Sequence, residues 1–139
     1  MPHRRVILYL DDDPLQTEVF RELFSDRYDV RTAATPSEAR RILRDCVPDI
    51  VISDHRMPEM DGTEFLREAA RVCPDSFRVL LTGAVTVGSV LPEVAAGLVQ
   101  LFLPKPWTAH EMDEALERAV AGLDVRRKAR RRTRPHQKR

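Results

Sequence analysis

Three aspartates follow apolar segments of the chain, at points where a strand would leave the protein interior. Asp11 and Asp12 come after the apolar run of residues 6–10, and Asp54 comes directly after residues 49–53. Carboxylates that lie close together repel one another and raise each other's pKa values. Mg²⁺ relieves this repulsion, because it prefers oxygen ligands and needs few protein groups. A carboxylate nucleophile beside a bound cation is what phosphoryl transfer to an aspartate requires.

The simpler interpretation of an acid after a strand is a helix cap, because Asp is a preferred N-cap residue. Asp13 fits that role, since Pro14 follows it at the first helical position. The three other aspartates are harder to explain as caps, because the predicted fold brings them to one place. Asp54 is therefore the candidate phosphate acceptor.

Two further polar residues follow predicted strands. Thr82 stands in Leu81-Thr82-Gly83, and Lys105 stands between two prolines. The threonine hydroxyl can hydrogen-bond a phosphoryl oxygen, and the lysine ammonium can pair with a carboxylate or a phosphoryl oxygen. The Lys105–Pro106 bond is a candidate cis peptide, because X-Pro bonds are where cis peptides occur. Together with the three acids, these residues form one predicted site.

Apolar runs alternate with amphipathic segments, which predicts five β–α units. The predicted strands are residues 6–10, 28–33, 49–53, 77–81 and 99–103, and the predicted helices, caps included, are 13–26, 35–46, 61–72, 86–96 and 108–123. Apolar strands that alternate with helices indicate an α/β fold with a doubly wound parallel sheet. We expect a flavodoxin-like five-stranded sheet of order 2-1-3-4-5, with the ligand site beyond the carboxyl ends of the strands. Gly88 and Pro92 predict that the fourth helix is short, kinked or mobile.

The composition is that of one domain with a real core. The chain has 139 residues, 42% of them hydrophobic. Its apolar run at residues 6–10 is far shorter than the ~20 residues of a membrane span. We therefore expect a soluble, cytoplasmic protein without a membrane span, in which Cys46 and Cys73 are reduced thiols.

The motifs resemble those of the receiver domain of two-component response regulators, of the single-domain, chemotaxis-regulator-like kind. The resemblance covers about residues 5–121. It is carried by Leu10 to Pro14, by DIVISDHRMPEMDG at residues 49–62, by Leu81 to Gly83, and by Lys105 to Trp107. Order, spacing and strand-end context agree in all of them, so the resemblance is specific.

The resemblance implies a phosphorylation-activated signalling switch. Asp54 would accept a phosphoryl group from a sensor histidine kinase or a phosphotransferase, and Lys105 would pair with that group. The resemblance assigns the Mg²⁺ ligands to Asp11, Asp12, Asp54 and the backbone carbonyl of Arg56. Thr82 and Phe102 would be the switch residues, although Phe102 is equally explained as a plain core phenylalanine.

The family's output surface consists of the fourth helix, the fifth strand and the fifth helix, and the family often forms homodimers through it. The resemblance implies a downstream protein target, whose identity the sequence leaves open. It also implies no enzyme activity beyond Mg²⁺-dependent phosphorylation and dephosphorylation of the chain itself. A metal-dependent hydrolase is the enzyme alternative, and the lack of a visible second general base disfavours it.

The carboxyl end differs from the rest of the chain in charge. Residues 126–139 hold nine of the 23 Lys and Arg residues, whereas residues 1–125 hold 14 basic and 22 acidic residues, a net charge of −8. We predict a receiver domain at residues 1–123 and a basic tail at 124–139, which extends the last helix and then becomes disordered.

Three interpretations of the tail remain open. It is a solvated tail, as blocks of like charge commonly are, or a remnant of a multidomain response regulator. Alternatively, it is the output of a nucleic-acid-associated regulator and binds nucleic acid, anionic lipid or an acidic partner. Nucleic-acid binding would be non-specific, since no aromatic residues are interleaved for base stacking. The residues concerned are Arg126, Arg127, Lys128, Arg130, Arg131, Arg132 and Arg134.

Overall fold

A computed structural model of the chain describes residues 4–83, 92, 94 and 96–133, and its centre is a five-stranded sheet. The strands are β1 (Val6–Leu10), β2 (Asp29–Ala33), β3 (Ile50–Asp54), β4 (Phe77–Thr82) and β5 (Leu101–Pro104). Their order is β2-β1-β3-β4-β5, and every neighbouring pair is parallel. The predicted fold class and strand order are confirmed.

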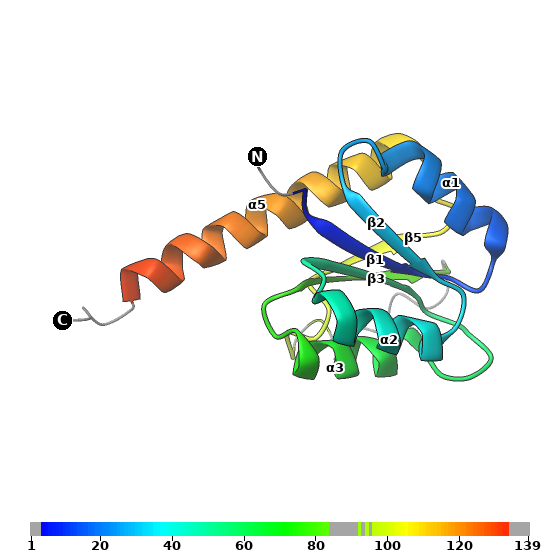
Figure 1. Cartoon of the computed structure of the whole chain (residues 1–139), viewed down its shortest axis with the longest axis horizontal. Coiled ribbons are helices and arrows are strands. Elements are labelled where there is room, and N and C mark those ends of the chain that lie inside the picture. The colour runs from blue at the N-terminus through cyan, green and yellow to red at the C-terminus, as the bar shows by residue number, and fades with distance from the viewer. Residues whose placement is uncertain (1–3, 84–91, 93, 95, 134–139) are drawn as a thin grey trace.

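Helices cover both faces of this sheet (Figure 1). The described helices are α1 (Pro14–Phe24), α2 (Pro36–Cys46), α3 (Gly62–Val72) and α5 (Ala109–Thr133). α1 and α5 lie on one face, and α2 and α3 lie on the other. The predicted fourth helix, with Gly88, falls mostly outside the described residues. Among those described, the Ala96 N–H donates to the Pro92 carbonyl at 2.9 Å.

The helices begin where the capping residues predict. The Asp13 side chain accepts the Leu15 N–H, which satisfies a free backbone donor at the start of α1. Reciprocal bonds join Thr108 and Glu111 at the start of α5, as a capping box requires. These local signals place each helix start directly after a strand-end loop.

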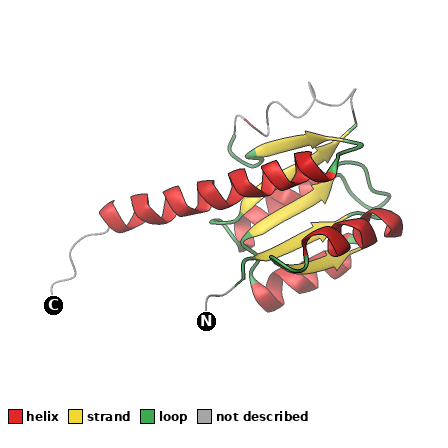
Figure 2. Ribbon diagram, turned by 90° about the horizontal axis from the view of Figure 1, so that it is seen from above, coloured by secondary structure: helices red, strands yellow, loops and turns green. Residues whose placement is uncertain are grey.

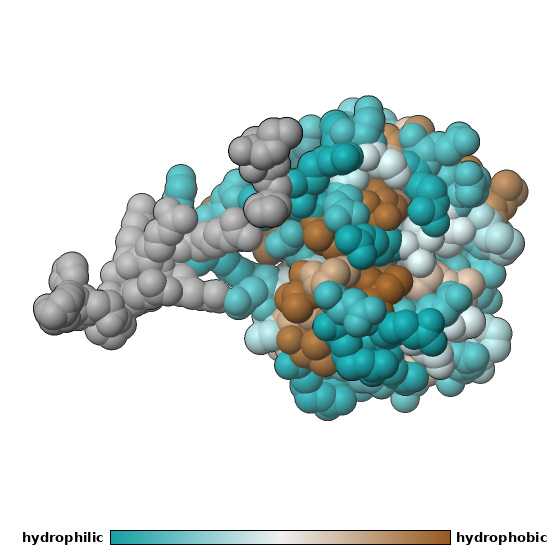
Figure 3. All heavy atoms as spheres, viewed as in Figure 1, coloured by the Kyte–Doolittle hydropathy of each residue, from teal (hydrophilic) through white to brown (hydrophobic). Residues whose placement is uncertain are grey.

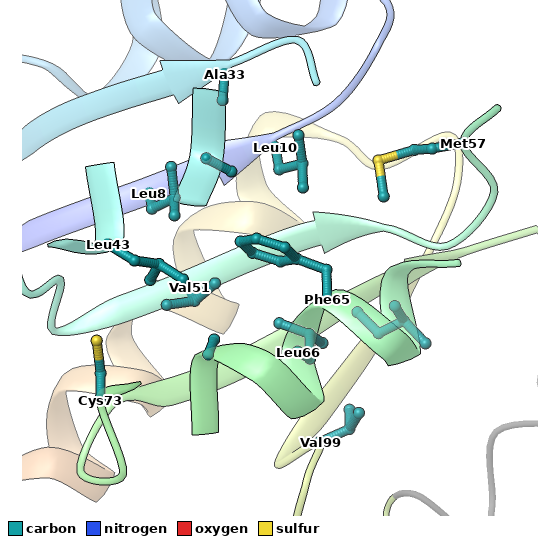
Figure 4. Close-up of a cluster of buried hydrophobic side chains, with 13 residues drawn as sticks. Leu8, Leu10, Ala33, Leu43, Val51, Met57, Phe65, Leu66, Cys73 and Val99 are labelled. Carbon is teal, nitrogen blue, oxygen red and sulfur yellow. The ribbon is translucent and has the colours of Figure 1, made fainter. Parts of the chain in front are cut away.

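The core consists of two clusters, one on each face of the sheet. Leu8 and Leu10 of β1 point to the α2–α3 side, whereas Ile7 and Tyr9 point to the α1–α5 side. This alternation follows from the two-residue period of a strand. Figure 4 shows the first cluster, in which the Phe65 ring of α3 lies over β1 and β3. Burial on both faces fixes the register of the strands and therefore the positions of their ends.

α5 is longer than the stripe of apolar residues that predicts it. Among the side chains of α5 whose burial is described, the last buried one is Leu123, yet the helix continues to Thr133 and projects past the sheet (Figure 2). At the point of departure, the Arg126 guanidinium donates to the carbonyls of Asp75 and Ser76. The first turn of the basic segment is thus held against the body of the domain.

The outer surface is mixed in character. On the face shown in Figure 3, hydrophobic surface gathers in a patch across the middle of the body and is bordered by hydrophilic side chains. Among the described helices, none combines the length and the apolar composition that crossing a membrane would demand.

The amino-terminal edge of the strands, opposite the carboxyl ends, contains a cavity of about 270 Å³. Its lining includes Val47, Cys73, Pro74 and Leu123. Val47 has a φ of 40°, in the left-handed region that a β-branched residue rarely adopts. This cavity lies away from the strand-end acids.

Candidate functional site

The three predicted acids converge at the carboxyl edge of the sheet. β1 and β3 are neighbours, with Leu10 beside Ser53, so Asp11, directly after β1, lies beside Asp54, the last residue of β3. One carboxylate oxygen from each of Asp11, Asp12 and Asp54 lies within 4.8 Å of the others. Asp11 and Asp54 are buried, whereas Asp12 is exposed. The acids therefore form a pocket with one side open to solvent, at the point where strand order reverses.

Lys105 enters this pocket from the loop after β5. Its Nζ lies 3.1 Å from Oδ1 of Asp54 and 3.8 Å from Oδ2 of Asp11. Burial alone lowers the pKa of Lys105, but the Asp11 and Asp54 carboxylates outweigh it and raise the pKa above its ordinary value. The Lys105–Pro106 peptide is cis, as predicted. The lysine is therefore held as a cation against the candidate phosphate acceptor.

Asp11 is a buried acid in an unfavourable position. Its pKa is raised to about 6, chiefly by burial; the Asp13 backbone N–H opposes the rise and the Asp54 charge adds to it. A carboxylate that burial and a like charge both disfavour gains from a cation placed beside it. The electrostatics of the pocket thus favour binding of a positive ion.

Thr82 ends β4 next to β3, with its side chain fully buried. Among the described residues, its hydroxyl oxygen has no hydrogen-bond partner. A buried hydroxyl without a partner costs free energy, so the large majority of such groups are paired in native proteins. The unpaired Thr82 hydroxyl indicates a site that a polar ligand would complete. We call Asp11, Asp12, Asp54, Thr82 and Lys105 the acid pocket.

Gly62, at the start of α3, supports Asp54 from behind. Its N–H donates to the His55 carbonyl at 2.7 Å. A Cβ at this position would lie 2.1 Å from the Asp54 carbonyl oxygen, which is far shorter than a van der Waals contact, so only glycine fits. Sequence reasoning treated Gly62 only as part of a cap and missed this contact. The signal was its place in the motif of residues 49–62.

The structure places two other predicted residues without testing their roles. Arg56 is exposed in the loop two residues after Asp54, and its carbonyl remains a predicted ligand. Phe102 lies on β5, half-buried, and packs against the core cluster on the α2–α3 side. That position is compatible with a core residue as well as with a switch residue.

The predicted electrostatic residues are spread along the last turns of α5. Arg126 binds backbone carbonyls of the body, and Lys128 is exposed. Arg127, Arg130, Arg131 and Arg132 lie on the same helix, and Arg134 falls outside the described residues. Arg126 is therefore partly used within the domain.

The donor set of the acid pocket fits Mg²⁺. Three carboxylates supply hard oxygen ligands, and the exposure of Asp12 leaves room for the waters that Mg²⁺ retains. The unpaired Thr82 hydroxyl and the Lys105 ammonium are suited to the oxygens of an anion beside that cation.

Most of the chain matches a known protein family. The sequence model of the response regulator receiver domain matches residues 7–117. The chain belongs to this family. The predicted resemblance is thereby confirmed, and the acid pocket lies within the matched segment of this receiver domain.

Relatives are found among regulators and solved receivers. Transcriptional regulatory protein GlrR of Escherichia coli K12 is 34% identical over 125 residues, 86% of this chain and 28% of that protein. A solved adenylate cyclase chain of Rhodopirellula baltica aligns with a TM-score of 0.89 at 25% identity, over 96% of this chain and 99% of that one. A receiver domain protein of Clostridium thermocellum gives 0.79 at 28% identity, over 87% and 98%. This chain spans about a quarter of the length of the curated relatives it matches first.

Proposed function

We propose that this receiver domain is a switch that accepts a phosphoryl group on Asp54 from the phosphohistidine of a sensor kinase or a phosphotransferase. The observation that carries the proposal is the position of Asp54, within 4.8 Å of the carboxylate oxygens of Asp11 and Asp12 and 3.1 Å from the Lys105 ammonium. An Asp54 carboxylate oxygen attacks phosphorus, the phosphorus–nitrogen bond breaks, and the imidazole leaves with the electron pair and takes up a proton.

Each pocket residue has a part in this step. When bound by Asp11, Asp12, Asp54 and the Arg56 carbonyl, Mg²⁺ supplies positive charge that offsets the charge of the phosphoryl oxygens. Lys105 exchanges its contact with the Asp54 carboxylate for one with a phosphoryl oxygen. Thr82 gives its unpaired hydroxyl to another phosphoryl oxygen.

The output of the switch is a shift in an existing equilibrium between two states. Phosphorylation adds charge and three acceptor oxygens, and Thr82 and Phe102 respond to it. The affected surface comprises the fourth helix, β5 and α5, through which a protein target or a second copy binds. In this proposal the domain acts in the cytoplasm and catalyses only its own phosphorylation and dephosphorylation.

The outer face of α1 is our proposed contact for the histidine-bearing partner. Leu15, Val19 and Leu23 recur every four residues and are 69%, 39% and 39% exposed. They form an apolar stripe on the helix that begins directly after the pocket acids. Autophosphorylated histidine kinases from a purified panel test this role. Val19→Asp should slow transfer from the most active kinase and leave phosphorylation by phosphoramidate unchanged. Val72→Asp, at an exposed position of α3, should leave both reactions unchanged.

Intact mass spectrometry tests the phosphorylation itself. After incubation with phosphoramidate and Mg²⁺, the wild-type domain should gain one phosphoryl group, and Asp54→Asn should gain none. Asp29→Asn, which removes an acid paired with Arg31 on β2, is the matched control and should behave as wild type. A wild-type domain that gains nothing, or an Asp54→Asn variant that gains as much, would contradict the proposal.

A further inference from the structure

Tyr9 places a hydroxyl group beneath the acid pocket. It lies on β1, two residues before Asp11 and on the same side of the strand, and it is fully buried. Its hydroxyl donates to Oδ2 of Asp11 at 3.5 Å, and its ring stacks on Phe20 with centroids 4.2 Å apart. The ring belongs to the core, whereas the hydroxyl belongs to the environment of a pocket acid.

The Asp11 carboxylate is oriented by donors on both of its oxygens. Oδ1 accepts the Asp13 backbone N–H at 3.0 Å. Oδ2 faces the Tyr9 hydroxyl and, at 3.8 Å, the Lys105 ammonium. Lys105 lies closer to Asp54, so Tyr9 is the side-chain donor directed to Asp11 alone among the described residues.

Trp107 approaches the same hydroxyl from the loop just before α5. Its ring meets Phe20 edge-on, with centroids 6.3 Å apart and planes at 87°. Its indole N–H is buried and makes no hydrogen bond to a described residue. Burial and the Asp11 charge raise the pKa of the Tyr9 hydroxyl, while the nearby Trp107 N–H opposes the rise. The Tyr9 hydroxyl thus donates to Asp11, and its oxygen lies near the unpaired Trp107 N–H, which could donate to it.

We propose that Tyr9 is a positioning residue for Asp11 and that its hydroxyl links Mg²⁺ binding in the acid pocket to Trp107 just before α5. The inference rests on the proposed function, in which Asp11 is a Mg²⁺ ligand. Hydrogen-bond donors behind a ligating carboxylate hold it in the geometry that the metal needs. When Asp11 turns toward the cation, its contact with the Tyr9 hydroxyl changes, and with it the surroundings of the nearby unpaired Trp107 N–H.

The composition of the chain makes this link measurable. Trp107 is the one tryptophan, and Tyr9 and Tyr28 are the two tyrosines. Tyr9→Phe removes the hydroxyl and keeps the ring on Phe20, so the fold is expected to persist, as far-UV circular dichroism verifies. Tyr28→Phe removes the same atom from the residue just before β2 and is the matched control.

Two readouts of a Mg²⁺ titration test the proposal: heat in a calorimeter and Trp107 fluorescence. Wild type and Tyr28→Phe should bind with equal affinity and show the same change in fluorescence. Tyr9→Phe should bind about tenfold more weakly, the lower end of what such second contacts contribute, and its fluorescence change should be lost. Trp107→Phe, which keeps the donor to Asp11, should retain wild-type affinity in the calorimeter.

The outcomes separate the two proposals. If wild type binds Mg²⁺ and Tyr9→Phe matches it in both affinity and fluorescence change, the Tyr9 inference is overturned and the proposed function stands. If Trp107→Phe loses as much affinity as Tyr9→Phe, ring packing explains both, and the inference is again overturned. If wild type produces no heat with Mg²⁺ and gains no phosphoryl group, the proposed function itself fails.

Discussion

The two ends of β4 each bury a polar side chain, and they treat it in opposite ways. Arg78, near the start of the strand, is 5% exposed, and its guanidinium donates to the carbonyls of Ser76, Gly97 and Leu98 and to the Ser76 hydroxyl. Thr82, at the other end, is fully buried, and its hydroxyl has no partner among the described residues. Paired buried groups hold the fold together, whereas an unpaired one indicates a ligand.

The same contrast between paired and unfavourably placed polar groups extends to the two edges of the sheet. At the amino-terminal edge, Asp49 accepts the Val6 N–H at 2.8 Å, and the Ser76 hydroxyl donates to the Cys73 carbonyl. At the carboxyl edge, burial and a neighbouring carboxylate raise the pKa of Asp11. Polar groups with hydrogen-bond partners thus lie at the amino-terminal edge, whereas the unpaired Thr82 hydroxyl and the unfavourably buried Asp11 lie at the carboxyl edge.

Gly62→Ala should have the largest effect on stability, although Gly62 lies beside Asp54 at the carboxyl edge of the sheet. A methyl group would overlap the Asp54 carbonyl oxygen, so either α3 or the end of β3 must shift. We expect a loss of about 3 kcal/mol in the free energy of unfolding, measured by urea denaturation. Phosphorylation by phosphoramidate should also slow, because Asp54 is displaced. Gly83→Ala, where a Cβ meets no atom within 4 Å, is the control.

Arg78→Met tests the paired end of β4. The substitution removes the Arg78 donor from the Leu98 carbonyl and leaves the Gly97 carbonyl with Gln100 Nε2 as its remaining side-chain donor, which should lower the free energy of unfolding by about 2 kcal/mol. Phosphorylation of Asp54 should persist in the folded fraction. A variant as stable as wild type would show that this guanidinium does not hold the segment before β5.

Asp11→Asn tests how much the ionised Asp11 carboxylate lowers the free energy of unfolding when no Mg²⁺ is bound. Asp11 has a pKa of about 6 in the folded domain and 3.8 ordinarily. Stability from this group is therefore fully present below pH 4 and is lost as the pH rises through 6. With EDTA present, wild type should lose about 2 kcal/mol of unfolding free energy between pH 4 and 7 through this group. Asp11→Asn should not show that loss, and equal pH profiles for the two proteins would contradict the argument.

Thr82→Val should have the smallest effect on stability. The substitution removes a buried hydroxyl without a partner, so the free energy of unfolding should stay constant or rise by about 0.5 kcal/mol. Ser76→Ala removes a buried hydroxyl with partners and should lower it by about 1 kcal/mol. Thermal melts of the two variants sharpen the comparison, and a lower melting temperature for Thr82→Val would count against an unpaired hydroxyl.

The acid pocket was predictable because it depends on positions along the chain. Parallel strands place their carboxyl ends along one edge, so the residues that follow each strand must meet there. The cis Lys105–Pro106 bond was predictable because X-Pro is where cis peptides occur. By contrast, Arg78 is buried among backbone carbonyls 19 and 20 residues away, and carbonyl groups leave no mark in a sequence.

The extension of α5 beyond its apolar stripe was predicted, whereas the role of Tyr9 was not. The apolar stripe of α5 ends at Leu123, but lysine and arginine continue a helix readily, and no proline follows before Pro135. Tyr9 looks like one more residue of an apolar strand. Its hydroxyl acquires meaning only once the strand direction places it beneath Asp11.

The continuity of α5 fixes the angle around the helix axis at which its basic residues lie, relative to the body of the domain. α5 runs without a break for 25 residues, from Ala109 to Thr133, so each residue lies in a fixed direction around the helix axis. Each residue advances about 100° and 1.5 Å. One residue inserted after Arg126 would swing the following basic turns a quarter of the way round the axis, whereas seven would return them almost to their starting angle.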